Sequence, residues 1–176
     1  VTWGGTNYIA LGASGVPAEV NGMSNSWSSL RMTESIPALF PTADTTVDRR
    51  AALWTEGQTL TCDDLGTSLN GYSSFKFRNL NRNGSAPVQN NSYNNISDID
   101  FPVFRLSEIY LNYAESVLRG GTGGDASTAL SYINKLRGRA YPNNPGSSEG
   151  NISAGDLSLD FILDERAREL YWEAQR

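Results

Sequence analysis

Among the acidic residues that lie close together along the chain, we consider three pairs in which two carboxyl groups could act together. They are Asp63 with Asp64, Asp98 with Asp100, and Glu165 with Glu169. Sugar hydrolysis requires two carboxyl groups, about 5–9.5 Å apart, that flank one glycosidic bond. Arginines interleave Glu165 and Glu169 in the run DERARE, which predicts a salt-bridged helix surface instead. Asp63 and Asp64 are expected in a turn, and they are the best remaining pair for a hydrolase.

Metal chemistry and nucleophilic chemistry have few candidates in this sequence. Asp98 and Asp100, with Asn94 and Asn95, offer oxygen ligands for Ca²⁺, but their spacing matches no EF-hand. The chain has no His and a single cysteine, Cys62, which excludes a Ser-His-Asp triad, an intrachain disulfide and a zinc cluster. We expect no bound metal and no cofactor, and we assign Cys62 and Trp54 to structure.

Aromatic and amide side chains on loops suggest a different chemistry. Trp3, Asn7 and Tyr8 lie in a Gly-rich segment, and Trp27 lies in the run NGMSNSWSS. An exposed aromatic ring on a loop can stack on the apolar C–H face of a sugar, while an amide bonds its hydroxyl groups. These four residues are the predicted glycan-binding site. The alternative is that each aromatic ring packs within its own fold.

The composition bounds the class of protein. The 176 residues are 39% hydrophobic and 19% charged, with a net charge of −5. The acidic balance argues against a nucleic-acid surface, and no apolar run approaches the ~20 residues of a membrane-spanning helix. The chain starts at Val1 without Met and ends at Arg176 inside a helical pattern, so we expect a fragment of a longer protein.

Two regions of different composition must position these residues. Residues 1–100 are rich in Gly, Asn and Ser and predict a loop-rich, irregular region. Within it we expect a short helix over Thr33–Leu39 with Thr33 as its N-cap, and short strands within 51–60 and 71–80. Residues 101–176 show helical periodicity, so the predicted fold class is mainly α with few short strands.

The helical region is expected to hold three helices. The first ends at the Gly-rich stretch 120–124, the second follows the N-cap Asp125, and the third follows the N-cap Ser158. The first two form a hairpin of about 34 residues, the period of tetratricopeptide repeats.

Each helix is expected to bury one apolar stripe. The predicted inward-facing residues are Leu106, Ile109, Tyr110, Tyr113, Ala114, Val117 and Leu118 in the first helix, Ala126, Ala129, Leu130, Ile133 and Leu136 in the second, and Phe161, Ile162, Leu163, Ala167, Leu170, Tyr171 and Ala174 in the third. Trp172 is also assigned to the core. On the third helix we expect surface ion pairs between Asp164 and Arg168 and between Arg166 and Glu169.

Several stretches resemble the SusD/RagB family of Bacteroidota outer-membrane nutrient-binding lipoproteins. The resemblance is carried by FPVFRLSEIYLNYAES (101–116), ALSYINKLRGRA (129–140) and above all ILDERARELYWEAQR (162–176). The last stretch is close to the family's pattern of a hydrophobic pair, ERxxEL, an aromatic pair and a basic end. Looser matches are WGGTNYIALGASG (3–15), WSSLR (27–31) and LFPTAD followed by DRR.

The resemblance implies a mainly α-helical glycan-binding protein with tetratricopeptide-like hairpins. Such proteins are not enzymes. They capture oligosaccharides or polysaccharides at the cell surface for a TonB-dependent transporter of the SusC type. They are anchored in the outer membrane by an acylated N-terminal Cys, which this chain lacks. The family also has regions before and after this segment, so part of the glycan site and partner helices are expected outside it. Uncovered apolar faces would then favour self-association or pairing with another fragment.

Two other functions remain open. A helical-repeat module that binds a protein or peptide would make its contacts through the helix faces and not through the loops. A carbohydrate-active hydrolase would need a carboxylate pair outside the DERARE run, with Asp63 and Asp64 as its candidates.

Overall fold

The described part of the protein is mainly α-helical, which confirms the predicted fold class. The computed structural model describes residues 20, 31–67, 69–85 and 100–174. Contacts divide the chain into two compact units, Val1–Ala38 with Ala52–Phe101, and Leu39–Ala51 with Pro102–Arg176. We call them the loop unit and the helical unit and describe each by itself. The division into domains at residue 100 stays a prediction.

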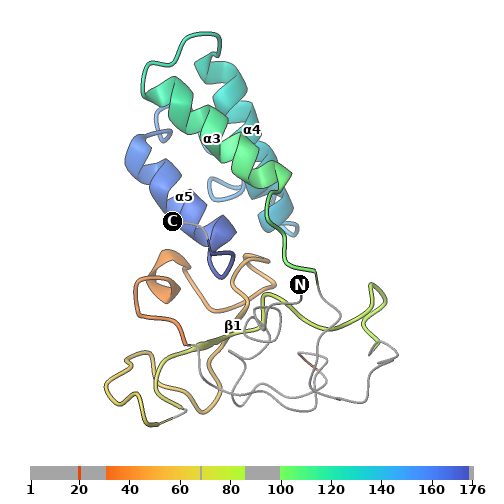
Figure 1. Cartoon of the computed structure of the whole chain (residues 1–176). Coiled ribbons are helices and arrows are strands. Elements are labelled where there is room, and N and C mark those ends of the chain that lie inside the picture. The colour runs from red at the N-terminus through yellow and green to blue at the C-terminus, as the bar shows by residue number, and fades with distance from the viewer. Residues whose placement is uncertain (1–19, 21–30, 68, 86–99, 175–176) are drawn as a thin grey trace. The chain divides into compact units, whose positions relative to one another are not determined.

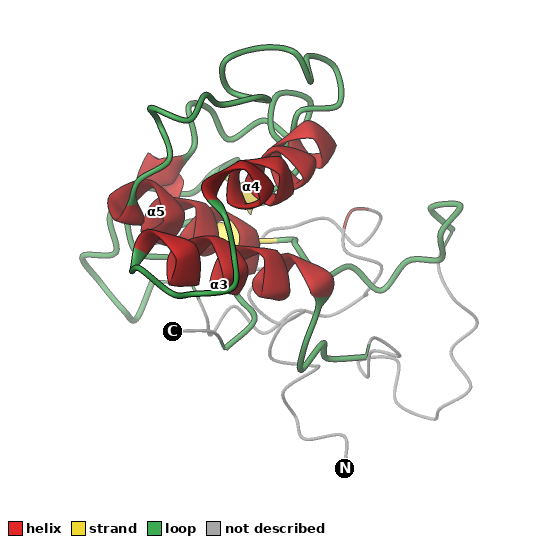
Figure 2. Ribbon diagram, turned by 90° about the horizontal axis from the view of Figure 1, so that it is seen from above, coloured by secondary structure: helices red, strands yellow, loops and turns green. Residues whose placement is uncertain are grey.

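The helical unit contains α3 (Leu106–Leu118), α4 (Ala126–Ala140) and α5 (Leu159–Leu170). The three helices lie side by side in both views (Figures 1 and 2). Both predicted N-caps are confirmed: Asp125 accepts a hydrogen bond from the Thr128 N–H, and Ser158 accepts one from the Phe161 N–H. Such caps satisfy backbone donors that the first helical turn leaves without partners.

The core of the helical unit is a small apolar cluster. Its buried members are Leu111, Ala114, Ala129, Ile133, Leu136, Ile152, Ile162 and Leu170. Five of these were predicted to face inward on α4 and α5, and Ala114 was predicted on α3. The loop residue Ile152 is added because the Asn134 side chain donates to its carbonyl oxygen and accepts from its N–H, at 3.0 and 2.9 Å.

The predicted inward face of α3 is wrong at its N-terminal end. Leu106 and Ile109 are 63% and 53% exposed, whereas Leu111 and Ser107 are buried. The apolar stripe of α3 is wider than the contact with its neighbours, so periodicity alone does not tell which edge is covered. Tyr110, on the intermediate edge, stacks on Tyr132 of α4 with ring centroids 4.4 Å apart.

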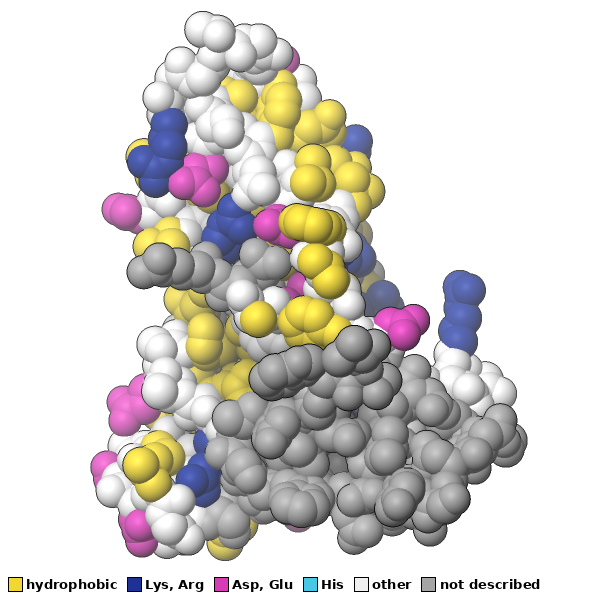
Figure 3. Space-filling view, viewed as in Figure 1, with side chains coloured by type: hydrophobic (Ala, Val, Ile, Leu, Met, Phe, Trp, Pro, Cys, Tyr) yellow, Lys and Arg dark blue, Asp and Glu magenta, His cyan; other side chains and the backbone are white. Residues whose placement is uncertain are grey.

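Smaller corrections concern the other two helices. Ala126, Leu163 and Ala174 are exposed and Trp172 is half-buried, although all four were assigned to the interior. In the α5 segment the buried positions include the acidic residues Glu165, Glu169 and Glu173. Hydrophobic side chains remain visible on the surface of the helical unit (Figure 3). By exposed fraction, the large hydrophobic residues at the surface include Val103, Phe104, Leu106 and Ile109, which we call the exposed apolar stripe.

The loop unit has little regular structure. Strand β1 (Leu53–Trp54) pairs antiparallel with β2 (Ser73–Ser74), with Leu53 opposite Ser74. Both strands fall in the segments where the sequence predicted them. Isolated bridges join Met32 to Tyr72 and Thr59 to Asn70.

The helix predicted over Thr33–Leu39 is only a 3₁₀ turn, η1 (Pro37–Leu39). The Thr33 hydroxyl contacts the Ser35 hydroxyl instead of capping a helix. Pro41 follows within two residues of the turn, and the residue before a proline avoids helical conformation, so the turn cannot extend into a longer helix.

Candidate functional site

The predicted glycan-binding residues lie outside the part that the structure describes. This applies to Trp3, Asn7, Tyr8 and Trp27, so their assignment stays a prediction. Of the suggested calcium ligands, Asp98, Asn94 and Asn95 also lie outside it, and Asp100 is exposed. Within the described ranges, no group of three or more His, Cys, Asp or Glu residues is arranged to hold a metal ion.

Asp64 stabilises a turn, as predicted for this acidic pair. Its carboxylate accepts hydrogen bonds from the Gly66 N–H and the Thr67 hydroxyl, both at 2.8 Å. These bonds lower the pKa of Asp64, with the Thr67 hydroxyl the larger influence. A carboxylate held ionised in this way suits a turn better than the proton-donating half of a hydrolytic pair.

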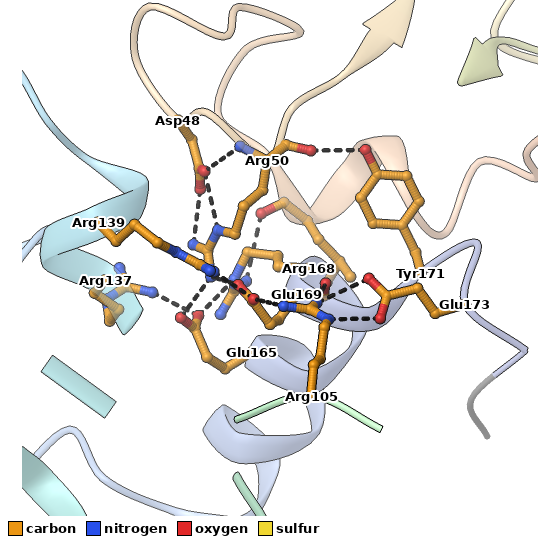
Figure 4. A network of polar contacts seen from close by, with 11 residues as sticks. Asp48, Arg50, Arg105, Arg137, Arg139, Glu165, Arg168, Glu169, Tyr171 and Glu173 are labelled. Carbon is orange, nitrogen blue, oxygen red and sulfur yellow. Dashed lines mark hydrogen bonds and ion pairs between the residues drawn. The ribbon is translucent and has the colours of Figure 1, made fainter. Parts of the chain in front are cut away.

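Glu165 and Glu169 of α5 are buried, together with Glu173 just after the helix, which corrects the predicted helix surface. Glu165, Glu169 and Glu173 recur at every fourth residue, and their exposed fractions are 0%, 1% and 4%. Glu165 and Glu169 therefore lie on one side of α5, and Glu173 follows the helix, which ends at Leu170. The arginines predicted beside them are present, but most of the ion pairs reach other segments of the helical unit (Figure 4).

Glu165 is surrounded by three guanidinium groups. Its Oε1 accepts from Arg50 at 2.7 Å, and its Oε2 accepts from Arg137 of α4 at 2.6 Å. Arg168, one turn along α5, donates to the same Oε2 at 2.9 Å. Arg168 therefore pairs with Glu165 and not with the predicted Asp164.

Glu169 and Glu173 share Arg105, which immediately precedes α3. The Arg105 Nη1 lies 2.5 Å from Glu169 Oε1, and its Nε lies 2.6 Å from Glu173 Oε2. Arg139 of α4 also contacts Glu169 Oε1. The predicted pair of Arg166 with Glu169 is wrong, because Arg166 contacts Asn112 and lies 3.7 Å from Glu115. The carboxylates of α5 thus bind α5 to both other helices.

The same network holds the segment 39–51 against the helices. Arg50 pairs with Asp48 at 2.8 Å as well as with Glu165. The Tyr171 hydroxyl donates to the Arg50 carbonyl oxygen at 2.7 Å, and the Arg49 N–H donates to the Ala140 carbonyl oxygen at 2.8 Å. We call Asp48, Arg50, Arg105, Arg137, Arg139, Glu165, Arg168, Glu169 and Glu173 the buried ion network.

Electrostatics keeps Glu165, Glu169 and Arg50 of this network charged. Burial is the largest single influence on the pKa of Glu165 and raises it, but the combined attraction of Arg50, Arg137 and Arg168 is greater. The pKa of Glu165 therefore lies below its ordinary value, and the pKa of Glu169 is lowered likewise by Arg139 and Arg105 against the effect of burial. The Arg50 pKa is raised by its carboxylate partners despite burial. Carboxylates that stay ionised among arginines are structural ion pairs and not general acids.

Short charged runs in the sequence contain most of the residues of the buried ion network, but they do not reveal which residues pair. The runs DRR at 48–50 and RGR at 137–139 supply four of the residues, and DERARE supplies three. Periodicity assigns such charged residues to a surface, and their partners are distant in sequence, up to 115 residues for Arg50 and Glu165.

None of the described helices combines the length and apolar character that crossing a membrane requires.

Comparison with known proteins agrees with the resemblance seen in the sequence. The model of the SusD family matches residues 45–176, a range that contains the whole buried ion network. The chain is also 36% identical over 114 residues to the starch-binding protein SusD of Bacteroides thetaiotaomicron. The match covers 65% of this chain but 18% of that protein, so the chain spans a small part of its relative's length.

Proposed function

The chain belongs to the SusD family, and from this membership we propose that it is part of a cell-surface glycan-binding protein. The observation that carries the proposal is the family match over residues 45–176, together with the similarity to a protein named for starch binding. In the proposed role the protein captures oligosaccharides or polysaccharides and delivers them to a TonB-dependent transporter of the SusC type. It acts in nutrient uptake and does not cleave the glycan.

The proposed division of labour follows from the chemistry of the residues. The buried ion network has its charges paired inside the helical unit, so it supports the fold and does not contact glycan. The glycan contacts are assigned to Trp3, Asn7, Tyr8 and Trp27. In this proposal Trp3 and Tyr8 stack on sugar faces and Asn7 bonds hydroxyl groups.

Titration calorimetry with oligosaccharides tests this assignment. Maltoheptaose, a soluble starch fragment, is the first ligand because of the starch-binding relative. The double variant Trp3→Ala/Tyr8→Ala is expected to lose glycan binding and to keep the helical circular dichroism signal. Leu65→Ala is the matched control, because Leu65 is 81% exposed on a loop and has no assigned role. Unchanged affinity in the double variant would contradict the site assignment.

A second candidate function is protein or peptide binding without sugar binding. The exposed apolar stripe favours it, since Val103 and Phe104 are 64% and 78% exposed beside Leu106 and Ile109. An apolar surface of this kind favours association. Replacing Phe104 by Ser would then reduce self-association in light scattering, whereas a compact monomer before the substitution would argue against this candidate.

The hydrolase alternative has little support among the described residues. Asp64 is bonded within its turn, and Glu165 and Glu169 are held by arginines. A reducing-sugar assay with the glycan that binds is expected to show no turnover. Release of reducing ends would restore the hydrolase hypothesis.

Anchoring in the outer membrane through a lipid is proposed for the full-length protein on the same family grounds.

A further inference from the structure

The helical unit has an open depression between the loop that follows α4 and the start of α5. Its volume is about 420 Å³, within the range of about 300–1,000 Å³ that is usual for small-molecule sites. We propose that this depression is a second carbohydrate subsite that takes neutral, hydroxyl-rich sugar rings. The inference rests on the proposed glycan-binding function and adds a site away from the loop residues assigned to it.

The lining combines polar and apolar side chains, which complement the hydroxyl groups and the C–H face of a sugar ring. Ser148, Glu149, Asp156 and Ser158 supply hydroxyl and carboxylate oxygens around the depression. Ile152 and Phe161 supply apolar surface. Carboxylates and hydroxyls accept hydrogen bonds from sugar hydroxyls, and apolar side chains cover the C–H face of the ring.

The remaining wall is Arg137, a member of the buried ion network. Its Nη1 donates to Glu165, whereas its buried Nε has no hydrogen-bond partner among the described residues. Because this nitrogen is shielded from solvent, Arg137 closes the wall of the depression, and we assign it no hydrogen bond to a sugar.

Charge decides which sugars the depression favours. The positive charge of Arg137 is already paired with Glu165, while Glu149 and Asp156 add two negative charges to the lining. Hydrogen bonds from its own backbone N–H and from the Ser147 hydroxyl lower the pKa of Glu149, and bonds from Ser153 lower the pKa of Asp156. Both carboxylates are therefore ionised at neutral pH and repel uronic acids and other anionic sugars.

The depression is formed by a loop that is firmly held. Asn134 of α4 forms two hydrogen bonds with the backbone of Ile152. The Asp156 carboxylate accepts from the Ser153 N–H and hydroxyl at 2.9 and 2.7 Å. The Phe161 ring lies against the guanidinium groups of Arg137 and Arg168, at 5.2 and 5.7 Å. A site that is ordered before binding loses less conformational entropy when the ligand arrives.

A second depression on the same unit makes a useful contrast. It measures about 360 Å³ and is lined by Glu115, Arg119 and Arg166 together with residues of α5. Both of its arginines have partners, since Arg119 pairs with Glu115 at 2.8 Å and Arg166 contacts Asn112. Among the described residues its lining holds no hydroxyl side chain, whereas the depression beside Arg137 has Ser148 and Ser158.

Nuclear magnetic resonance titration of the whole chain tests the inference. Maltoheptaose, a neutral glycan, and an oligogalacturonide, an acidic one, are added separately to ¹⁵N-labelled protein. We expect saturable amide shifts within residues 147–161 for maltoheptaose and at least tenfold weaker binding for the oligogalacturonide. Glu149→Ala is expected to weaken binding at 147–161 at least fivefold, and Phe161→Leu keeps the apolar volume but removes the ring and should weaken it as well.

The control variant is Asp164→Ala, which removes an exposed carboxylate of α5 that does not line the depression. It should leave the affinity at 147–161 unchanged. Shifts that saturate only outside 147–161, or equal affinity for the acidic glycan at this site, overturn the inference and leave the proposed function intact. Absence of shifts anywhere with either of these glycans and with the other oligosaccharides of a panel overturns both.

Discussion

The two units of this chain are built by different means. The helical unit combines a small apolar cluster with a buried ion network whose carboxylates, Glu165, Glu169 and Glu173, are less than 5% exposed. The loop unit has two strands of two residues each and relies on turns and side-chain hydrogen bonds. In it, Gln58 forms two bonds with Ser73, at 2.9 and 2.8 Å.

The difference between the two units indicates how a chain with 39% hydrophobic residues specifies its fold. Buried ion pairs are often no more stabilising than apolar packing of the same volume, but they are costly to break, because a lone buried charge remains. The network joins segment 39–51, α4 and α5 with defined partners, whereas the turns of the loop unit fix shorter stretches. We therefore expect single substitutions to have their largest effects in the network.

The strongest test of this comparison is Glu165→Ala. The substitution leaves Arg50 and Arg137 buried without their common partner, and we expect a loss of about 3–5 kcal/mol in the free energy of unfolding. Urea unfolding followed by helical circular dichroism measures it. Glu115→Ala is the control, because its pair with the exposed Arg119 is expected to contribute about 0.3–0.5 kcal/mol. Equal losses in the two variants would remove the distinction between buried and exposed pairs.

Acid should weaken the helical unit through the same residues. Glu165 and Glu169 have folded-state pKa values below the ordinary 4.5, so their stabilisation is present above pH 4.5 and is lost as the pH falls through the folded-state values. The urea midpoint should be steady from neutral pH to about pH 5.5 and fall below pH 4.5. Glu165→Gln/Glu169→Gln should flatten this dependence. A midpoint that falls between pH 7 and 6 would implicate other groups.

Gly150→Ala probes the loop of the helical unit. A Cβ at this position would lie 2.7 Å from the Asn144 carbonyl oxygen and 2.9 Å from that of Pro145, so the backbone must move. We expect a loss of about 1–3 kcal/mol in the free energy of unfolding, measured in urea. Gly146→Ala is the matched control, since a Cβ there meets no atom within 4 Å. Equal free energies of unfolding for the two variants would show that the loop backbone moves at little cost in free energy.

Gln58→Ala examines the loop unit. The backbone N–H of the buried Ser73 loses its side-chain acceptor, and we expect a local cost of about 1 kcal/mol. Hydrogen exchange at the Ser73 amide should accelerate, while helix amides of the helical unit should exchange as before. Glu56→Ala, an exposed residue nearby, is the control. Faster exchange throughout the helical unit would mean that the two units do not differ in the way described.

The sequence predicted the features that depend on local chemistry. Asp125 and Ser158 cap helices because a side-chain oxygen at that position bonds the backbone within three residues. The three helices follow from their periodicity in the same way. The family also followed from the sequence, since ILDERARELYWEAQR lies within the matched range.

Features that depend on distant partners were missed or misread. Glu165 and Glu169 were predicted at a surface, because their buried partners come from segments far away along the chain. Leu106 and Ile109 were predicted inside, because periodicity does not reveal which edge of a wide apolar stripe another element covers. The glycan-site assignment to Trp3, Asn7, Tyr8 and Trp27 stays a prediction.

The central claim, glycan binding, is tested most directly by a tryptophan-fluorescence titration. The chain is titrated with a panel of oligosaccharides that includes starch-type and host-type glycans, and helical circular dichroism is recorded alongside. The account predicts a saturable change with one class of glycan, because Trp3 and Trp27 are assigned to the site. No change with any glycan, while the helical signal is intact, would contradict glycan binding by this chain.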